Sequence, residues 1–566
     1  MPDEFIIIPS VNQGREFIEI ATDFSNPIEL VREAVSNAYD AEANQIQIIF
    51  DVVEVDGRET LRIRLIDNGS GMTREGLKAF FDLGNSTRRN DHGKVGEKGH
   101  GTKVFFNSSL IRVTTVAQGK KLVATLDRPL SAFRAGNIPE VRVVEDVLPE
   151  AIQSSTEIEI LGYNHDQKGV FTHERLKDYI LWFTKHGSIE GVFRNPEATA
   201  TLYLKGLDRD EPEEIPAGHP FPDENSDLEG LFEAYLVKAP DYYCKRIVAS
   251  GTLPNNPEKH YSAVFSLEGT HVKYGYNPML RRSGYTAPRG CYTVQERYGL
   301  WLCKDYIPIQ KKNDWITTKG TEYTKFHAFF NCQALNLTAN RGSVENTPAD
   351  VMADIQSEVR RLYSTIVEGE DWRGIDWLEG QSVGYRTIEK ERRDFDWRRQ
   401  KVNQSSIAQF EGQLLVEPRH ESGVHAMFVQ LATIRPELFP FHILDYDTHE
   451  GIDLIVKSDS VTPIATARLF YVEFKYTLTN EFNHSFANLH SIICWDTELR
   501  HDDPVTDIGG EARKVRISQP QAPGQRTKYY LENPQQANRI EILVLKDFLR
   551  EELGLEFRPR TEQSVI

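Results

Sequence analysis

Two carboxylates and a lysine lie on two predicted strands in the C-terminal third of the chain. Asp453 starts the first strand, and Glu473 and Lys475 end the second, two residues apart and so on the same face. A Ser/Thr/Pro loop joins these strands, which predicts a hairpin. Two carboxylates and an ammonium at one sheet edge can hold Mg²⁺ and position a water for attack on a phosphodiester. The same ExK pattern is also common on solvated strand faces, so this chemistry is a hypothesis.

Two helices are predicted to flank the hairpin. The first begins at about Glu421, whose carboxylate is a candidate to complete the acidic set. The second covers Asn483–Trp495 and has His484 at its start. We expect a structural role for this histidine, with contact to a phosphate as the alternative.

This order of elements resembles the PD-(D/E)XK nuclease fold, a restriction-endonuclease-like αββα arrangement. The resemblance implies that Lys475 lies beside the attacking water and that Mg²⁺ is the metal, with Mn²⁺ as an alternative at this site. It also implies a set of metal ligands, namely Glu421, Asp453 and Glu473.

Three polar residues recur at helical spacing near the N-terminus. Glu33, Asn37 and Asp40 stand at positions i, i+4 and i+7 and share one helix face. We predict that the helix begins with Asn26 as N-cap and Pro27 as its first residue. The face is otherwise apolar, and polar side chains are costly to bury there without a ligand. A solvated helix face is the alternative.

A second polar cluster follows a predicted hairpin over residues 45–67. Asp67 ends this hairpin and is followed by a Gly-Ser-Gly turn. A carboxylate at a strand end can accept a hydrogen bond from an adenine amino group, and the glycines let the backbone bend beneath the base. Further on, Gly96–Gly101 leads into a helix at Thr102. A glycine-rich loop before a helix offers free N–H groups to phosphates.

Together these pieces resemble the GHKL (Bergerat-fold) ATPases: gyrase, heat-shock chaperones, histidine kinases and MutL. The resemblance implies that Glu33 is the general base for water, that Asn37 holds Mg²⁺ and that Asp67 recognises adenine. It implies a lid that starts at Gly84–Thr87, and Glu33 favours an ATPase over a kinase. The implied ATP-binding residues are Asn37, Asp40, Asp67, Gly69, Gly71, Met72, Ser86, Thr87, Gly96, Lys98, Gly99, His100, Gly101, Thr102 and Thr156.

ATP hydrolysis also needs a cation at the γ-phosphate, where charge develops in the transition state. The segment 335–346 resembles the transducer loop of MutL and MORC ATPases, which implies that Arg341 supplies this charge. Lys311 and Lys312 are the alternative sources of this charge. The simplest interpretation of Arg341 is an arginine in an ordinary turn.

The composition argues against several classes of protein. The chain has 566 residues, five scattered cysteines and a net charge of −18, which argues against a protein that coats nucleic acid over its whole surface. No apolar run is long enough for a membrane span, and the N-terminus lacks signal-peptide features. We therefore expect a cytoplasmic protein without membrane partners.

We predict a multidomain α/β chain whose N-terminal part is a Bergerat α/β sandwich. Its parts are an ATP-binding domain (1–165), an α/β transducer (166–375), a charged connector (376–405) and a nuclease-like domain (406–566). The predicted function is an ATP- and Mg²⁺-dependent nuclease that cuts DNA, dimerises on ATP and acts in bacterial defence, with a partner subunit as a further expectation. The alternatives are a MORC-like DNA clamp whose C-terminal domain only binds, and a chaperone-like ATPase.

Overall fold

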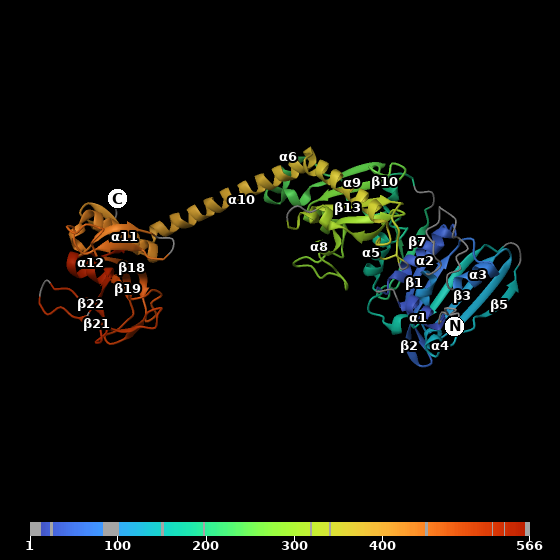
Figure 1. The fold of residues 1–566 in the computed structure, drawn as a ribbon, viewed down its shortest axis with the longest axis horizontal. Coiled ribbons are helices and arrows are strands. Elements are labelled where there is room, and N and C mark those ends of the chain that lie inside the picture. Colours follow the sequence, from blue (N-terminus) through green and yellow to red (C-terminus); the bar gives the residue numbers. More distant parts are fainter. Residues whose placement is uncertain are drawn as a thin grey trace, which may run out of the picture. The chain divides into compact units, whose positions relative to one another are not determined.

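The computed structural model describes residues 13–22, 26–82, 101–148, 152–195, 199–316, 320–338, 341–447, 451–522, 525–536 and 538–560. The chain divides into two compact units between Thr387 and Ile388, inside helix α10 (Glu370–Asn403; Figure 1). Its short 3₁₀ helices are η1 (Gly101–Phe106), η2 (Tyr163–Asp166), η3 (Ile189–Val192), η4 (Leu236–Tyr242), η5 (Asn313–Trp315), η6 (Glu322–Lys325) and η7 (Pro436–Leu438).

The first part of unit 1 is an eight-stranded sheet covered on one face by helices. The strand order is β5-β4-β3-β6-β2-β1-β7-β8. Alternate strand residues such as Ile46, Ile48 and Phe50 are buried in one core with α2, so the sheet and helices form two layers. The strands are β1 (Gln45–Val55), β2 (Arg58–Asp67), β3 (Leu110–Ala117), β4 (Lys120–Asp127), β5 (Arg142–Val147), β6 (Ser155–Leu161), β7 (Thr201–Lys205) and β8 (Glu213–Ile215). The helices are α1 (Gln13–Thr22), α2 (Glu29–Asp40), α3 (Arg74–Phe81), α4 (Pro129–Arg134) and α5 (His173–Phe183).

Several predictions for this part can be compared with the structure. The hairpin over 45–67 is confirmed, with Asp56 and Gly57 at positive φ in its turn. The helix start is wrong by two residues: Asn26 accepts the N–H groups of Ile28 and Glu29 in a turn before α2. Strands β7 and β8 belong to the same sheet. The sheet therefore extends past residue 165, the predicted end of the domain.

The second part of unit 1 is a five-stranded sheet of order β12-β11-β13-β10-β9. One face packs against α9 and the start of α10. The other face packs against Trp182 of α5, so α5 lies between the two sheets of this unit. The strands are β9 (Cys244–Thr252), β10 (His260–Glu268), β11 (Gly299–Lys304), β12 (Ile307–Lys311) and β13 (Phe326–Cys332). The helices are α6 (Leu228–Tyr235), α7 (Thr270–Tyr276), α8 (Val294–Arg297) and α9 (Ala349–Val367).

Unit 2 contains an eight-stranded sheet of order β16-β17-β18-β19-β23-β22-β21-β20 and a small sheet of order β15-β14-β24. Strands β16, β17 and β18 are antiparallel neighbours, whereas β19 runs parallel to β18 and to β23. The helices α11 (Glu421–Ile434) and α12 (Leu545–Leu553) share one core with the sheet. The strands are β14 (Ser406–Phe410), β15 (Gln413–Val416), β16 (His442–Tyr446), β17 (Leu454–Lys457), β18 (Leu469–Leu478), β19 (Leu489–Thr497), β20 (Pro504–Thr506), β21 (Ala512–Ser518), β22 (Lys528–Glu532), β23 (Ile540–Val544) and β24 (Arg558–Pro559).

The predicted hairpin and its first flanking helix are confirmed, but the second helix is wrong. Residues 483–495 form a loop and strand β19 instead. Ile493 and Trp495 enter the core with α11, while Ile492 and Cys494 enter a second core on the opposite face. A strand buried on both faces gives a continuous apolar run, which periodicity alone cannot distinguish from a buried helix.

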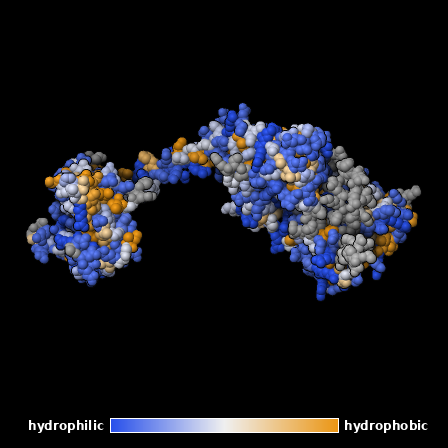
Figure 2. Space-filling view, in the orientation of Figure 1, coloured by the Kyte–Doolittle hydropathy of each residue, from blue (hydrophilic) through white to orange (hydrophobic). Residues whose placement is uncertain are grey.

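The charged connector is helical, since α10 includes all of Lys390–Lys401. In the described part of the chain, no helix is both long and apolar enough to cross a membrane. The visible face of each unit is mostly hydrophilic, with hydrophobic residues scattered among the polar ones (Figure 2).

Candidate functional site

The carboxylate of Asp67 lies at the end of β2, between two neighbouring strands. It pairs in register with Ile46 of β1 and with Thr156 of β6. Its Oδ1 accepts the N–H of Gly69 at 2.9 Å. Burial raises the pKa of this carboxyl to about 6, and the Gly69 hydrogen bond opposes the shift. A half-buried carboxylate with acceptor capacity to spare is suited to a neutral donor such as an amino group.

Two threonines beside Asp67 fix the following turn. Thr115 of β3 lies opposite Thr156, and their hydroxyl oxygens are 3.2 Å apart. The Thr115 hydroxyl also accepts the N–H of Met72 at 2.8 Å. The structure therefore brings together Asp67, Met72 and Thr156 as predicted from the sequence, with Thr115 as a member that the sequence did not indicate.

The glycines of this turn are required by close backbone contacts. A Cβ on Gly69 would lie 2.6 Å from the carbonyl oxygen of Ala41, at the end of α2. Gly71 has φ +68°, and a Cβ there would lie 2.1 Å from the carbonyl oxygen of Val116. Both positions let the turn pack directly against α2 and β3.

The polar face of α2 is close to the start of η1. Glu33 and Asn37 are half-buried and Asp40 is buried. A Cβ on Gly101 would lie 2.0 Å from the Glu33 carboxyl carbon, so this carboxylate rests against the glycine backbone. Thr102 donates its hydroxyl to the carbonyl of Phe80 at 2.9 Å. The helix predicted at Thr102 is the 3₁₀ helix η1.

Lys103 is a residue of this region that the sequence did not single out. It is fully buried, and its ammonium donates to the Phe80 carbonyl at 2.7 Å and to the Thr102 hydroxyl at 2.8 Å. Burial lowers its pKa to about 8, while the charges of Glu33 and Asp82 oppose that shift. A buried cation beside Glu33 is therefore part of the candidate site. Six predicted lid residues lie outside the described residues: Ser86, Thr87, Gly96, Lys98, Gly99 and His100.

Arg341 lies next to the helix that carries Glu33. It has φ 56°, and it lines a small cleft with Arg32 and Ser36 of α2 and with Asp305. Arg32 and Ser36 each precede a predicted site residue, so Arg341 lies beside the part of α2 that carries Glu33 and Asn37.

The two alternative cations are engaged elsewhere. Lys311 donates its ammonium to the carbonyls of Gln295 and Glu296, at 3.1 and 2.7 Å. Lys312 lies over the Trp315 ring, 5.8 Å from its centre. Arg341, and neither of these lysines, lines the cleft beside Arg32 and Ser36.

The first candidate site lies in a region that matches a family of known proteins. Residues 26–155 match the model of the family described as histidine kinase-, DNA gyrase B- and HSP90-like ATPases. This part of the chain is a GHKL-type ATPase domain. No curated protein matches the chain. The match includes α2, the Asp67 turn, η1 and the first residue of β6.

A second candidate site lies in unit 2, outside the GHKL domain. Asp453 immediately precedes β17, and its Oδ2 accepts the N–H of Phe474 on β18 at 2.8 Å. Glu473 and Lys475 lie in the middle of β18 rather than at its end, because the strand continues to Leu478. The Lys475 ammonium donates to Oε1 of Glu473 at 3.0 Å. The structure thus brings the three predicted residues together.

Glu473 has two differently engaged oxygens. Its side chain is 2% exposed, and burial raises its pKa to about 7, against the opposing effect of Lys475. Oε1 contacts Lys475 and also Nε2 of His484, at 2.9 Å. Oε2 is buried and has no hydrogen-bond partner among the described residues. A buried carboxylate oxygen in this position is suited to a cation.

His484 and Glu421 complete the surroundings of Glu473 and Lys475. His484 is not in a helix, but the loop between β18 and β19 brings it to Glu473. Glu421 begins α11, as predicted, and its Oε2 lies 3.5 Å from the Lys475 ammonium. The ammonium therefore stands between the two glutamates.

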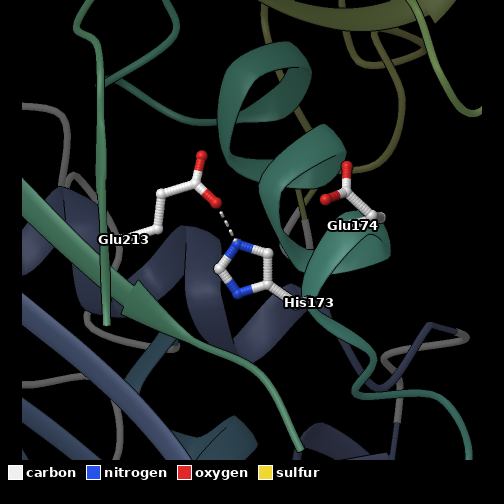
Figure 3. Close-up of side chains that lie close together, drawn as sticks. All are labelled: His173, Glu174 and Glu213. Atoms are coloured by element: carbon white, nitrogen blue, oxygen red, sulfur yellow. Dashed lines mark hydrogen bonds and ion pairs between the residues drawn. The ribbon is translucent and has the colours of Figure 1, made fainter. Parts of the chain in front are cut away.

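The three candidate acids of unit 2 are less closely grouped than another set in the molecule. Among the described residues, one set of three His, Asp or Glu side chains has ligand atoms within 4.8 Å of one another: His173, Glu174 and Glu213. Figure 3 shows His173 of α5 facing Glu213, with Glu174 on the same helix.

This tighter set is an ion-pair cluster rather than a metal centre. Nδ1 of His173 accepts the N–H of Gly206 at 3.3 Å, so Nε2 carries the proton and donates to Glu213 at 2.9 Å. Lys177 and Arg209 contact the same carboxylate at 2.6 and 3.0 Å. Both ring nitrogens are engaged, Glu213 is neutralised, and Glu174 lies 3.6 Å from Arg209, so this set is poorly suited to a cation.

Proposed function

We propose that the protein is an ATP-dependent nuclease, in which ATP binding and hydrolysis by the GHKL domain control DNA cleavage by unit 2. The Glu473 carboxylate is the observation that supports the nuclease part. Its Oε1 contacts Lys475 and His484. Its Oε2 is buried and has no hydrogen-bond partner among the described residues. The family match carries the ATPase part.

In the GHKL domain, the residues fit a nucleotide with Mg²⁺. Asp67 offers an acceptor to the adenine amino group, and Glu33 is placed to take a proton from water. Asn37, one helical turn after Glu33, would hold Mg²⁺, whose bound form neutralises phosphate charge. Arg341 would stabilise charge on the γ-phosphate, since it borders the same helix.

In unit 2, oxygen ligands from Asp453 and Glu473 fit Mg²⁺ or Mn²⁺. A bound divalent ion would lower the pKa of a coordinated water. Lys475 holds its proton on Nζ between Glu473 and Glu421. We propose that it turns from Glu421 toward the scissile phosphate, which would free Glu421 as a further ligand.

Closure of two chains on ATP would pair two cleavage sites on one DNA molecule. A homodimer, DNA as substrate and a defence role with a partner subunit all belong to this proposal.

A DNA-clamping ATPase with a binding-only C-terminal domain is the second candidate. The specific observation in its favour is the Lys475 ammonium, which occupies the space between two of the acids that a metal would need. Calorimetric titration of the full-length protein with Mn²⁺ separates the two functions. Binding that is lost in Glu473→Gln supports the nuclease, whereas the absence of binding supports the clamp.

The central test is incubation of plasmid DNA with the purified protein and Mg²⁺ or Mn²⁺, with and without ATP. We expect cleavage by the wild type and none by Glu473→Gln or Asp453→Asn, while both variants hydrolyse ATP at the wild-type rate. Asp459→Asn is a matched control, because Asp459 is an exposed acid in the loop of the same hairpin. Cleavage that survives in Glu473→Gln would show that the activity lies elsewhere.

A further inference from the structure

A basic segment of unit 1 stands out in an acidic protein. The chain has a net charge of −18, yet no Asp or Glu occurs between Gly269 and Gln295. This stretch contains Arg281, Arg282 and Arg289 in the loop between α7 and α8. The loop projects from unit 1 beside α8 in Figure 1. We call residues 277–293 the basic loop.

None of the three arginines contacts a carboxylate among the described residues, although the charge of Glu296 on α8 lies near Arg281. Their guanidinium groups donate to backbone carbonyls instead: Arg281 to Cys291, Arg282 to Tyr274 and Arg289 to Gly169, at 3.3–3.5 Å. In the ranges that the structure describes, none of the three forms an ion pair with a carboxylate within 4 Å. Arg281 and Arg289 are exposed.

Neighbouring basic residues behave differently. Arg297, just after the loop, is nearly buried and pairs with Asp178 at 2.7 Å. Lys273, just before it, is 2% exposed and donates to the backbone of Glu268. The uncompensated charge is therefore concentrated in the basic loop itself.

Aromatic side chains accompany the arginines. The Arg282 guanidinium lies over the Tyr285 ring at 4.3 Å and near the Tyr274 ring at 5.4 Å. Arginine stacked on tyrosine presents a flat cationic surface that can contact phosphates and sugars.

The basic loop is held in one shape. Arg281 N donates to the Tyr292 carbonyl at 2.8 Å, and Tyr292 N donates to the Met279 carbonyl at 3.1 Å. The Tyr292 hydroxyl donates to Asp178 of α5 at 2.5 Å. Because these contacts fix the two ends of the loop, less of its backbone has to be ordered when a ligand binds, which lowers the entropic cost of binding.

We propose that the basic loop binds the phosphate backbone of double-stranded DNA. Unpaired arginines with stacked tyrosines on an otherwise acidic molecule match a polyanion with regularly spaced phosphates. The loop is anchored to α5, which packs between the two sheets of unit 1, so bound DNA would contact the part of the molecule that includes the GHKL domain. This site is separate from the cleavage site in unit 2 and does not rest on it.

The test measures binding of the full-length protein to a fluorescent DNA duplex by anisotropy, in EDTA and without ATP, over a range of NaCl concentrations. For Arg281→Ala/Arg289→Ala we expect an affinity lower by about tenfold or more. The slope of log K against log salt should become shallower by about 2, because each phosphate contact contributes roughly one unit. EDTA removes divalent metal, so the result is independent of whether unit 2 cleaves DNA.

Arg360→Ala/Arg373→Ala is the matched control, since both residues are exposed arginines of the same unit on α9 and α10. It should bind DNA as the wild type does. Retained ATP hydrolysis by the basic-loop variant would show that it is folded. An unchanged salt slope, an equal loss in the control variant, or a loss confined to single-stranded DNA would each overturn the proposal.

Discussion

Asp67 in the GHKL domain is half-buried and Glu473 in unit 2 is buried, and the two carboxylates have different partners. Burial raises the pKa of both, to about 6 for Asp67 and about 7 for Glu473. Asp67 receives a neutral backbone N–H from Gly69, whereas Glu473 receives the ammonium of Lys475 and contacts the imidazole of His484. The direction of the pKa shift alone therefore does not distinguish the two sites.

The different partners of the two carboxylates indicate which ligand each can accept. Asp67 stands beside hydroxyl groups and backbone amides, so a neutral donor such as an adenine amino group completes its hydrogen bonds without adding charge. Glu473 has the Lys475 ammonium and the His484 imidazole on Oε1, and Oε2 has no hydrogen-bond partner among the described residues, so Oε2 could accept a cation. We therefore predict that substitutions at one of the two sites leave the activity of the other site unchanged.

The largest expected effect in the GHKL domain is that of Glu33→Ala. Loss of a general base should slow ATP turnover by roughly 10²–10⁴-fold while ATP still binds, because Glu33 does not contact the adenine-binding end of the pocket. Steady-state hydrolysis and equilibrium binding of a fluorescent nucleotide measure the two properties. Glu29→Ala, one turn earlier on α2, is the control and should hydrolyse normally. Turnover near the wild-type rate in Glu33→Ala would contradict the role of Glu33 as general base.

Arg341→Ala is the next largest effect. Removing a cation from the γ-phosphate should slow hydrolysis by about 10³-fold, judged from arginine fingers in other ATPases and GTPases. Lys311→Ala and Lys312→Ala serve as controls, since their ammonium groups contact backbone carbonyls and an indole ring. If one of the lysine variants loses activity and Arg341→Ala keeps it, the assignment of the cation is wrong.

The two regions also differ in how far the sequence predicted them. Gly69 and Gly71 of the predicted ATP site are recognisable because each permits a close backbone contact that a residue with a Cβ could not make, as Gly71 does with Val116. Asp453, Glu473 and Lys475 were predicted because strand pairing places them together across one hairpin.

The rest depends on tertiary packing. The strand β19 has an apolar run that a buried helix would share, so residues 483–495 were wrongly predicted as helical. Lys103 and His484 reach their carboxylates only through the folding of distant segments. Strand β7 joins the first sheet through parallel pairing with β1, and β8 follows in antiparallel pairing with β7, which no local pattern indicates.

Asp67→Ala should have a smaller effect, on binding rather than on chemistry. An adenine amino group left unpaired in the pocket costs about 1–3 kcal/mol, or roughly 5–150-fold in ATP affinity. Asp127→Ala is a matched control, because Asp127 ends β4 as Asp67 ends β2 but is 72% exposed. Glu473→Gln should leave ATP affinity unchanged. Equal losses in Asp67→Ala and Glu473→Gln would contradict the separation of the two sites.

The smallest expected effect is a pH dependence of ATP affinity that comes from Asp67. Its pKa in the folded protein is about 6, above the ordinary value for Asp, so the free pocket takes up a proton as the pH falls through 6. Adenine binding favours the ionised carboxylate, because that form accepts the amino hydrogen on its free electron pairs. Affinity should therefore fall by several-fold between pH 7 and pH 5.5.

The same shift has a defined sign for stability. Because the folded state binds this proton more tightly than the unfolded chain, the nucleotide-free domain should lose stability as the pH rises from about 4 to about 6. Nucleotide phosphates titrate in the neighbouring range, so the profile must be compared with that of Asp67→Asn, which keeps the shape of the side chain without its titration. A pH profile of ATP affinity that is the same in the wild type and in Asp67→Asn would show that Asp67 does not recognise the base as a carboxylate. A profile that flattens only in Asp67→Asn, and not in Asp127→Asn, would place the titrating group at the end of β2.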